Sequence, residues 1–254
     1  MATCKVCSDP LTITLDPEES GDEGQTVPDD LALPCNCHFH WQCLLDQAST
    51  VAFSLKCPSC STYLPSTPPG PSSTNSFLQS NANSQILTTY TNEGGVQPDL
   101  DILPVLTEEA FLASHPEARP ARAMHTLASE GDFQGILELM ADVDADQDID
   151  MSLVQLMGWT DPLNGGKSAL HVAVESQQEE VFWLLLWLGS AVKKDIFPQE
   201  VLSVAEAMGL PRRGTVPAEE DLRFVKDEAG KTAGDYCVQA GGQWQRILDG
   251  GLFN

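Results

Sequence analysis

Cysteine and histidine are concentrated in one short part of this chain. Seven of the eight cysteines lie in the first 60 residues, and the stretch CNCHFHWQC at 35–43 contains three cysteines and two histidines. Thiolate sulfur and imidazole nitrogen are the ligands that zinc prefers in proteins. In a compartment where thiols stay reduced, such clustering favours metal binding over disulfide bonds.

The candidate ligands fall into four pairs. Two ligands separated by two residues, as in CKVC and CPSC, can lie on one tight turn and bind a single ion. Four pairs are enough for two closed tetrahedral sites, so the expected cofactor is Zn²⁺, two ions per chain. Because this segment has little else to fold around, we expect each ion to contribute about 10–16 kcal/mol of apparent binding free energy. The eight candidates are Cys4, Cys7, Cys35, Cys37, His40, Cys43, Cys57 and Cys60.

The overall charge argues against several classes of partner. The chain has 13 Lys and Arg against 37 Asp and Glu, a formal net charge of −24, and no basic stripe interrupts it. Such a chain repels phosphate backbones, so we expect no nucleic-acid partner. The longest apolar run, 181–188, is too short to span a bilayer, so no membrane partner is expected. The first ten residues lack the apolar region of a signal peptide, which predicts a cytoplasmic or nuclear protein that is not secreted.

Composition divides the chain into three segments. The cysteine segment covers 1–64, and a stretch rich in Ser, Thr, Asn, Pro and Gly then predicts a flexible linker over 65–103. Apolar residues at helical spacing define the third segment, 104–254. No strand is expected beyond residue 64. The expected helices lie at 106–115, 122–130, 133–141, 169–176, 179–188, 198–208 and 233–248.

The ligand spacing resembles that of RING fingers, in which four ligand pairs bind two zinc ions in a cross-brace. The resemblance covers residues 4–60, and both long intervals, 8–34 and 44–56, fit the family. It implies a small zinc-stabilised α+β module in which the first pair joins the third and the second joins the fourth. One zinc would take Cys4, Cys7, His40 and Cys43, and the other would take Cys35, Cys37, Cys57 and Cys60.

The fourth ligand position departs from the usual pattern of that family. RING fingers usually have His there, whereas this chain has Cys37, with His38 as an alternative that breaks the spacing. PHD fingers share the resulting ligand order, but they need more residues between the fourth ligand and His40. They also need an aromatic residue two positions before the seventh ligand, where this chain has Leu55. The spacing therefore favours the RING resemblance over a PHD-like reader of histone tails.

The resemblance implies a ubiquitin ligase without a catalytic residue of its own. RING ligases bind a ubiquitin-conjugating enzyme charged with ubiquitin and hold its thioester in a reactive posture, so their contribution is positioning. Gln47 and Ser61 differ from the family, which often has a bulky apolar residue and a basic residue at these positions. At the docking groove, Val6 and Pro58 match the family. Trp41 and Leu44, on or near the expected short helix after His40, are further expected contacts that enlarge the groove, with the alternative that at least one residue of this helix belongs to the core.

The third segment resembles ankyrin repeats. The stretch 164–190 carries the repeat motif most clearly, 123–144 matches a second copy, and 230–248 matches a degenerate third. The resemblance implies an all-α, ankyrin-like helical stack with long insertions. His125 and His171 would then bond backbone in the turns, and Cys237 would be a core thiol. The pair Trp183 and Trp187 shares one helical face and is either packed against an insertion or exposed as a binding patch.

Two functions remain open from these resemblances. The first is a RING-type ubiquitin ligase whose ankyrin-like part recruits a protein substrate of unknown identity. The second is a non-catalytic adaptor whose zinc module serves docking; Gln47 and Ser61 favour it, whereas Val6 and Pro58 favour the ligase.

Overall fold

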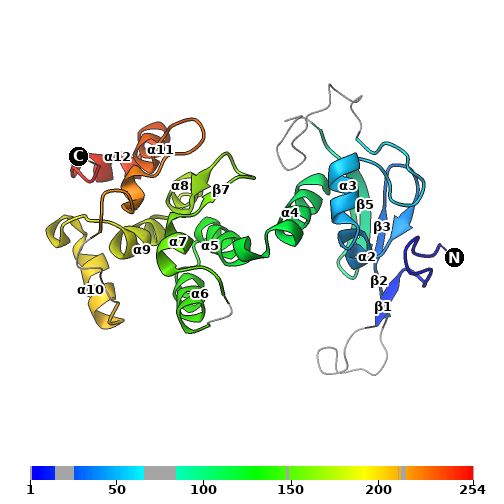
Figure 1. Cartoon of the computed structure of the whole chain (residues 1–254), viewed down its shortest axis with the longest axis horizontal. Helices are drawn as coiled ribbons and strands as arrows, with labels where there is room; N and C mark the ends of the chain where they lie inside the picture. The colour runs from blue at the N-terminus through cyan, green and yellow to red at the C-terminus, as the bar shows by residue number, and fades with distance from the viewer. Residues whose placement is uncertain are drawn as a thin grey trace. The chain divides into compact units, whose positions relative to one another are not determined.

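The computed structural model describes residues 2–14, 26–65, 84–146, 149–210, 212 and 216–253. It separates into two compact units, Met1–His115 and Pro116–Asn254. Figure 1 labels helices and strands of both. Both units combine helices with short antiparallel strands. Among the helices in the described ranges, none combines the length and the apolarity that crossing a bilayer requires.

A four-stranded antiparallel sheet organises the first unit. Its strand order is β4-β3-β5-β6, and a separate hairpin pairs β1 with β2. Leu31, at the centre of β3, pairs with Phe39 on one side and with Tyr90 on the other. The strands are β1 (Thr12–Thr14), β2 (Thr26–Pro28), β3 (Asp30–Ala32), β4 (His38–Phe39), β5 (Leu87–Asn92) and β6 (Gly95–Asp101).

Within the described residues of this unit, three helices share one core with the sheet. They are α2 (Trp41–Leu45), α3 (Ala48–Ser54) and α4 (Leu103–Ser114), with α3 packed against α4. Burial of apolar side chains is the main favourable contribution to such packing. The core side chains come from all parts of the unit: Leu31, Leu33, Phe39, Leu44, Val51, Ile86, Ile102, Leu106 and Ala110.

The second half of the expected linker is folded, and this part of the sequence analysis was wrong. Ile86 is fully buried in the core of the first unit, and residues 87–101 form the hairpin of β5 and β6. The first unit also includes α4, which the sequence analysis assigned to the helical segment from 104. Threonine and tyrosine favour strands, and the turn at 93–94 suits a hairpin, but the polar composition of the segment masked both signals. Residues 66–83 lie outside the described ranges.

The second unit is built from three helix pairs. The first helix of each pair packs on the first helix of the next, α5 on α8 and α8 on α11, while its own partner packs behind it. One such pair cannot bury its apolar face alone, so the pairs stack. The pairs are α5 (Arg119–Glu130) with α6 (Phe133–Ala145), α8 (Ala169–Glu175) with α9 (Glu179–Gly189), and α11 (Ala233–Ala240) with α12 (Gln243–Asp249).

The connections between the pairs add short elements. Helix α7 (Leu153–Gly158) and the strands β7 (Thr160–Asp161) and β8 (Lys167–Ser168) precede α8, and α10 (Gln199–Ala207) follows α9. The single helix expected over 233–248 is instead two helices. Its break lies at Gly241 and Gly242, whose φ angles of 62° and 57° favour glycine.

Hydrogen bonds of the buried His171 ring hold the start of the second pair and connect it to the residues before the third. The Nδ1 atom of His171 lies 2.7 Å from the Ser168 hydroxyl, and its Nε2–H donates to the Lys231 carbonyl at 3.1 Å. The pair Trp183 and Trp187 is buried against Phe197 in the insertion, so these rings are packing residues and not an exposed patch. Cys237 is fully buried.

Candidate metal centres

The first and fourth ligand pairs lie on turns of the same form. In the first turn the Ser8 N–H donates to the Cys4 carbonyl at 2.9 Å, and in the second the Ser61 N–H donates to the Cys57 carbonyl at 2.9 Å. Ser8 and Ser61 both have positive φ angles, 69° and 59°, which closes each turn back on its first cysteine. Each turn thereby presents its two thiols toward one point, as a metal-binding turn requires.

The second and third ligand pairs are positioned by the sheet and α2. Cys35 and Cys37 flank Asn36 in the turn between β3 and β4, where Asn36 has a φ angle of 58°. The Leu33 N–H donates to the Cys37 carbonyl at 3.0 Å and closes that turn. Strand β4 then leads directly into His40, and Cys43 follows one helical turn later in α2.

The eight side chains gather into two sets of four. The first set contains Cys4, Cys7, His40 and Cys43, and the second contains Cys35, Cys37, Cys57 and Cys60. Within each set the ligand atoms all lie within 4.8 Å of one another. These are the same two sets that the RING resemblance implies. The sets interleave, because the first ligand pair joins the third and the second joins the fourth.

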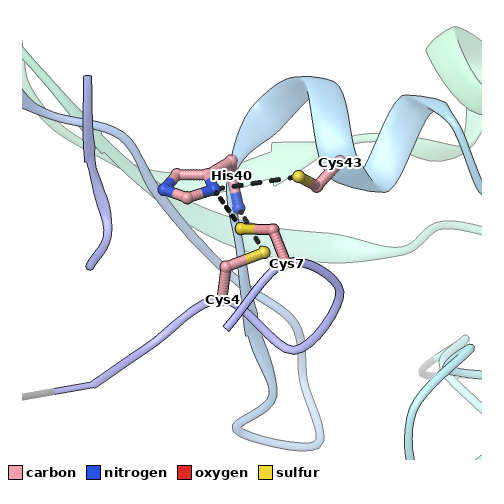
Figure 2. A group of neighbouring side chains, drawn as sticks. All are labelled: Cys4, Cys7, His40 and Cys43. Atoms are coloured by element: carbon pink, nitrogen blue, oxygen red, sulfur yellow. Dashed lines mark hydrogen bonds between the residues drawn. The ribbon is translucent and has the colours of Figure 1, made fainter. Parts of the chain in front are cut away.

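Distances within the first set fit a tetrahedral zinc site. Figure 2 shows the three thiols and the imidazole of this set turned toward one another. The Nδ1 atom of His40 lies 3.3 Å from the Cys7 sulfur and 3.7 Å from the Cys43 sulfur. Zinc bonds of about 2.3 Å to sulfur and 2.0–2.1 Å to nitrogen, at tetrahedral angles, place two such ligands about 3.6 Å apart. The residues therefore fit a zinc ion.

A second contact sets the tautomer of the histidine ligand. The Nε2–H of His40 donates to the Pro10 carbonyl at 2.8 Å, which leaves the lone pair of Nδ1 directed at the thiols. The Cys4 sulfur accepts the backbone N–H groups of Val6 and His40 at 3.5 Å and 3.4 Å. Such N–H donors stabilise a negatively charged sulfur, which is the form that binds metal.

The ionisation of the thiols is uneven within each set. Burial raises the pKa of Cys35 and of Cys43 to about 12. Burial also opposes ionisation of Cys4, but hydrogen bonds from backbone N–H groups lower its pKa to about 7. Hydrogen bonds with the hydroxyl and the backbone of Thr62 lower the pKa of Cys60 to about 6. Each set therefore combines a thiol that ionises near neutral pH, Cys4 or Cys60, with a thiol that loses its proton only when a cation binds, Cys43 or Cys35.

The fourth ligand position is occupied by Cys37 and not by its neighbour. The imidazole Nδ1 of His38 lies 2.7 Å from Oδ1 of Asp30 on the adjacent strand, so His38 pairs with a carboxylate. Cys37 is buried within the second set. The structure therefore distinguishes the two alternatives: the Cys37 thiol lies with the other ligands of the second set, whereas the His38 ring lies against Asp30.

The expected conjugating-enzyme contacts do not all reach the surface. Val6 is 44% exposed, and Trp41 and Pro58 are partly exposed. Leu44 is 0% exposed, so the sequence analysis was wrong to place it among the contacts. Helix α2 has only five residues, and its one fully buried face points Leu44 into the core.

Two residues that support the site were not found by sequence reasoning. Asp29 lies in the acidic interval 8–34 between the first and second ligand pairs, yet it is only 5% exposed. Its carboxylate accepts the backbone N–H of Trp41 and the hydroxyl of Tyr90. Tyr90 lay in the expected linker, where a lone aromatic residue in the strand-forming run LTTYTN was the available signal.

Comparison with known proteins adds no relative. No protein-family profile, no curated protein and no solved structure matches this chain. The metal-binding character of the site therefore rests on ligand identity and on the grouping of the ligands into two sets. With four protein ligands in each set, a bound ion has every tetrahedral position filled, which is typical of structural zinc.

Proposed function

We propose that the chain is a RING-type ubiquitin ligase whose first unit binds two Zn²⁺ ions. The observation that carries this proposal is the interleaving of the two ligand sets, the arrangement of the RING cross-brace. A chain that only needed to fix its terminus would be served by one zinc site. Interleaved sites hold the two metal-binding turns at a set separation, which a docking surface between them needs.

The ligase would act by positioning a charged ubiquitin-conjugating enzyme. Val6 lies inside the first metal-binding turn and Pro58 inside the second, and both are accessible. Trp41 follows the ligand His40 and is also partly exposed. An apolar surface of this kind excludes water from a partner's apolar residues. Orienting a bound thioester toward an amine lowers the entropy cost of the reaction without a covalent step on the ligase.

The second unit would recruit the protein substrate. Its three stacked helix pairs and the hydrogen bond between the His171 ring and the Lys231 carbonyl support an ankyrin-type stack. Stacked repeats of this kind form extended binding surfaces. Joining the two units in one chain would raise the effective concentration of substrate near the bound conjugating enzyme.

A non-catalytic adaptor is the second candidate, and specific residues favour it. Ser61 follows the last ligand where RING ligases often have a basic residue, and its φ of 59° belongs to the turn itself. Leu44 adds nothing to the docking surface because it is buried. An adaptor of this kind would bind two zinc ions and a protein partner without accelerating ubiquitin transfer.

The test is discharge of ubiquitin to free lysine from a panel of charged conjugating enzymes. The zinc-loaded full chain should accelerate discharge, Val6→Ala should reduce the acceleration, and Cys57→Ser should abolish it. Val96→Ala is the matched control, because Val96 is 63% exposed on β6 of the same unit and outside both metal-binding turns. A wild-type chain that carries two zinc ions and accelerates discharge from no enzyme of the panel would replace the ligase with the adaptor.

A further inference from the structure

Tyr90 connects the hairpin of β5 and β6 to the residue that follows a zinc ligand. Its hydroxyl donates to Oδ1 of Asp29 at 3.0 Å. Its ring lies against Trp41, with centroids 5.0 Å apart and planes inclined by 41°. Tilted aromatic pairs at this distance attract each other beyond their shared buried area. Tyr90 therefore contacts Trp41 directly through its ring. It is also linked to the backbone N–H of Trp41 through the Asp29 carboxylate, which accepts hydrogen bonds from both residues.

Asp29 forms the polar half of this connection. Its two carboxylate oxygens accept the backbone N–H of Trp41 at 3.2 Å and 3.3 Å. That N–H is in the first turn of α2 and has no acceptor within the helix. Because Asp29 is only 5% exposed, its carboxylate depends on these donors for satisfaction. Loss of the Tyr90 hydroxyl would leave a buried charged oxygen with one donor fewer.

The sheet explains why Tyr90 is held in this position. Tyr90 pairs with Leu31 and Thr91 pairs with Asp30 in the ladder between β5 and β3. Ile86, just before β5, is fully buried and anchors the start of the hairpin. Burial and the neighbouring Asp29 carboxylate raise the pKa of Tyr90 to about 12, so its hydroxyl remains a donor at neutral pH.

We propose that Tyr90 is a positioning residue of the docking surface: with Asp29, it holds the partly exposed Trp41 ring in the orientation that contacts the conjugating enzyme. This inference rests on the proposed function. The hairpin of β5 and β6 would then contribute to conjugating-enzyme binding through Tyr90, although it supplies no metal ligand. A freely rotating Trp41 would lose side-chain entropy on binding, so holding it in advance strengthens binding without changing the transfer step.

The test compares four variants of the zinc-loaded full chain. Tyr90→Phe removes the hydroxyl, Tyr90→Leu removes the ring as well, and Trp41→Ala removes the contact itself. Thr89→Ala is the matched control, because Thr89 is an exposed neighbour on the same strand. Three quantities are measured: zinc per chain by native mass spectrometry, the conjugating-enzyme concentration that gives half-maximal discharge, and the maximal rate. The Trp41 ring is followed by ¹⁹F NMR of 5-fluorotryptophan chains.

We expect two zinc ions in every variant and an unchanged maximal rate in both Tyr90 variants. The half-maximal concentration should rise about threefold in Tyr90→Phe and about tenfold in Tyr90→Leu. The resonance that Trp41→Ala removes should shift or broaden in both. Tyr90 variants that match Thr89→Ala in all three quantities would overturn the inference and leave the ligase standing. Loss of zinc from Tyr90→Phe would also overturn it, by showing a purely structural role. A wild-type chain that is inactive with every enzyme overturns the ligase and this inference together.

Discussion

Protonation of one buried histidine should set the acid stability of the second unit. His125 in α5 is 4% exposed, and its ring lies edge-on against Trp159 with centroids 5.0 Å apart. Burial lowers its pKa from 6.5 to about 4, with a further contribution from the charge of Arg122. Because the pKa is lowered in the fold, the unfolded chain binds the proton more readily. The stability that neutral His125 contributes is therefore complete above pH 6.5 and is lost as the pH falls toward 4.

The size of the effect follows from that difference in pKa. One pKa unit corresponds to about 1.4 kcal/mol, so a difference of about 2.5 units between pKa values of 6.5 and about 4 limits the loss to about 3 kcal/mol. Between pH 7 and pH 5, linkage gives a loss of about 2 kcal/mol from His125 alone. That is a large part of the stability of a typical domain.

The assay is urea unfolding of the full chain, followed by tryptophan fluorescence at pH 7, 6 and 5. Four of the five tryptophans lie in the second unit, and a Trp41→Phe background removes the signal of the fifth. His125→Leu in the same background removes the titrating group and keeps the site apolar. His171, whose pKa burial also lowers, titrates in both chains and cancels in the difference. If His125→Leu loses as much stability from pH 7 to pH 5 as its parent, the lowered pKa is refuted.

Four further outcomes concern packing and metal. Leu44→Ala should lower the unfolding free energy of the first unit by about 2–5 kcal/mol while its zinc content stays at two ions, measured by denaturation and native mass spectrometry. Trp244→Ala should cost the second unit about 3–5 kcal/mol, because this buried ring packs on Phe182 and its Nε1–H donates to Gln177; urea unfolding measures it. Arg223→Leu should cost about 3–5 kcal/mol by the same assay, because it leaves the buried Asp221 carboxylate unpaired. Chelation of zinc should raise hydrogen exchange in the described helices and strands of the first unit and leave those of the second protected, and equal exchange in both units would contradict the division.

The metal ligands could be anticipated because their information is local. A thiol pair such as Cys4 and Cys7 needs only a tight turn. The residues between the two cysteines and the residue after them, Ser8, form that turn. The helical segments could also be predicted from the sequence, because apolar residues that recur at helical spacing over ten or more positions indicate a helix even where single positions depart from the pattern. The helix predicted over 233–248 did not include the break, because it treated Gly241 and Gly242 as helical, whereas both have positive φ angles.

The support around the ligands could not be anticipated because it depends on contacts distant in sequence. Asp29 and Tyr90 are 61 residues apart, and neither has a local pattern that indicates burial. Within strand β5 only Thr88 is buried, and Tyr90, Thr91 and Asn92 are partly exposed, so the strand has no run of apolar residues that would reveal it. Leu44 was misjudged because helix α2 is too short for a hydrophobic period to reveal its buried face.

The interleaving of the two zinc sites is tested most directly by counting metal in two double variants. Native mass spectrometry should find one zinc in Cys4→Ser/Cys43→Ser, since both substitutions fall in the first set and leave the second intact. It should find none in Cys4→Ser/Cys35→Ser, since these substitutions damage both sets. If instead the first ligand pair shared a site with the second, and the third with the fourth, the two zinc counts would be reversed. One zinc retained in Cys4→Ser/Cys35→Ser, with none in Cys4→Ser/Cys43→Ser, would contradict the cross-brace and remove the basis for the proposed ligase.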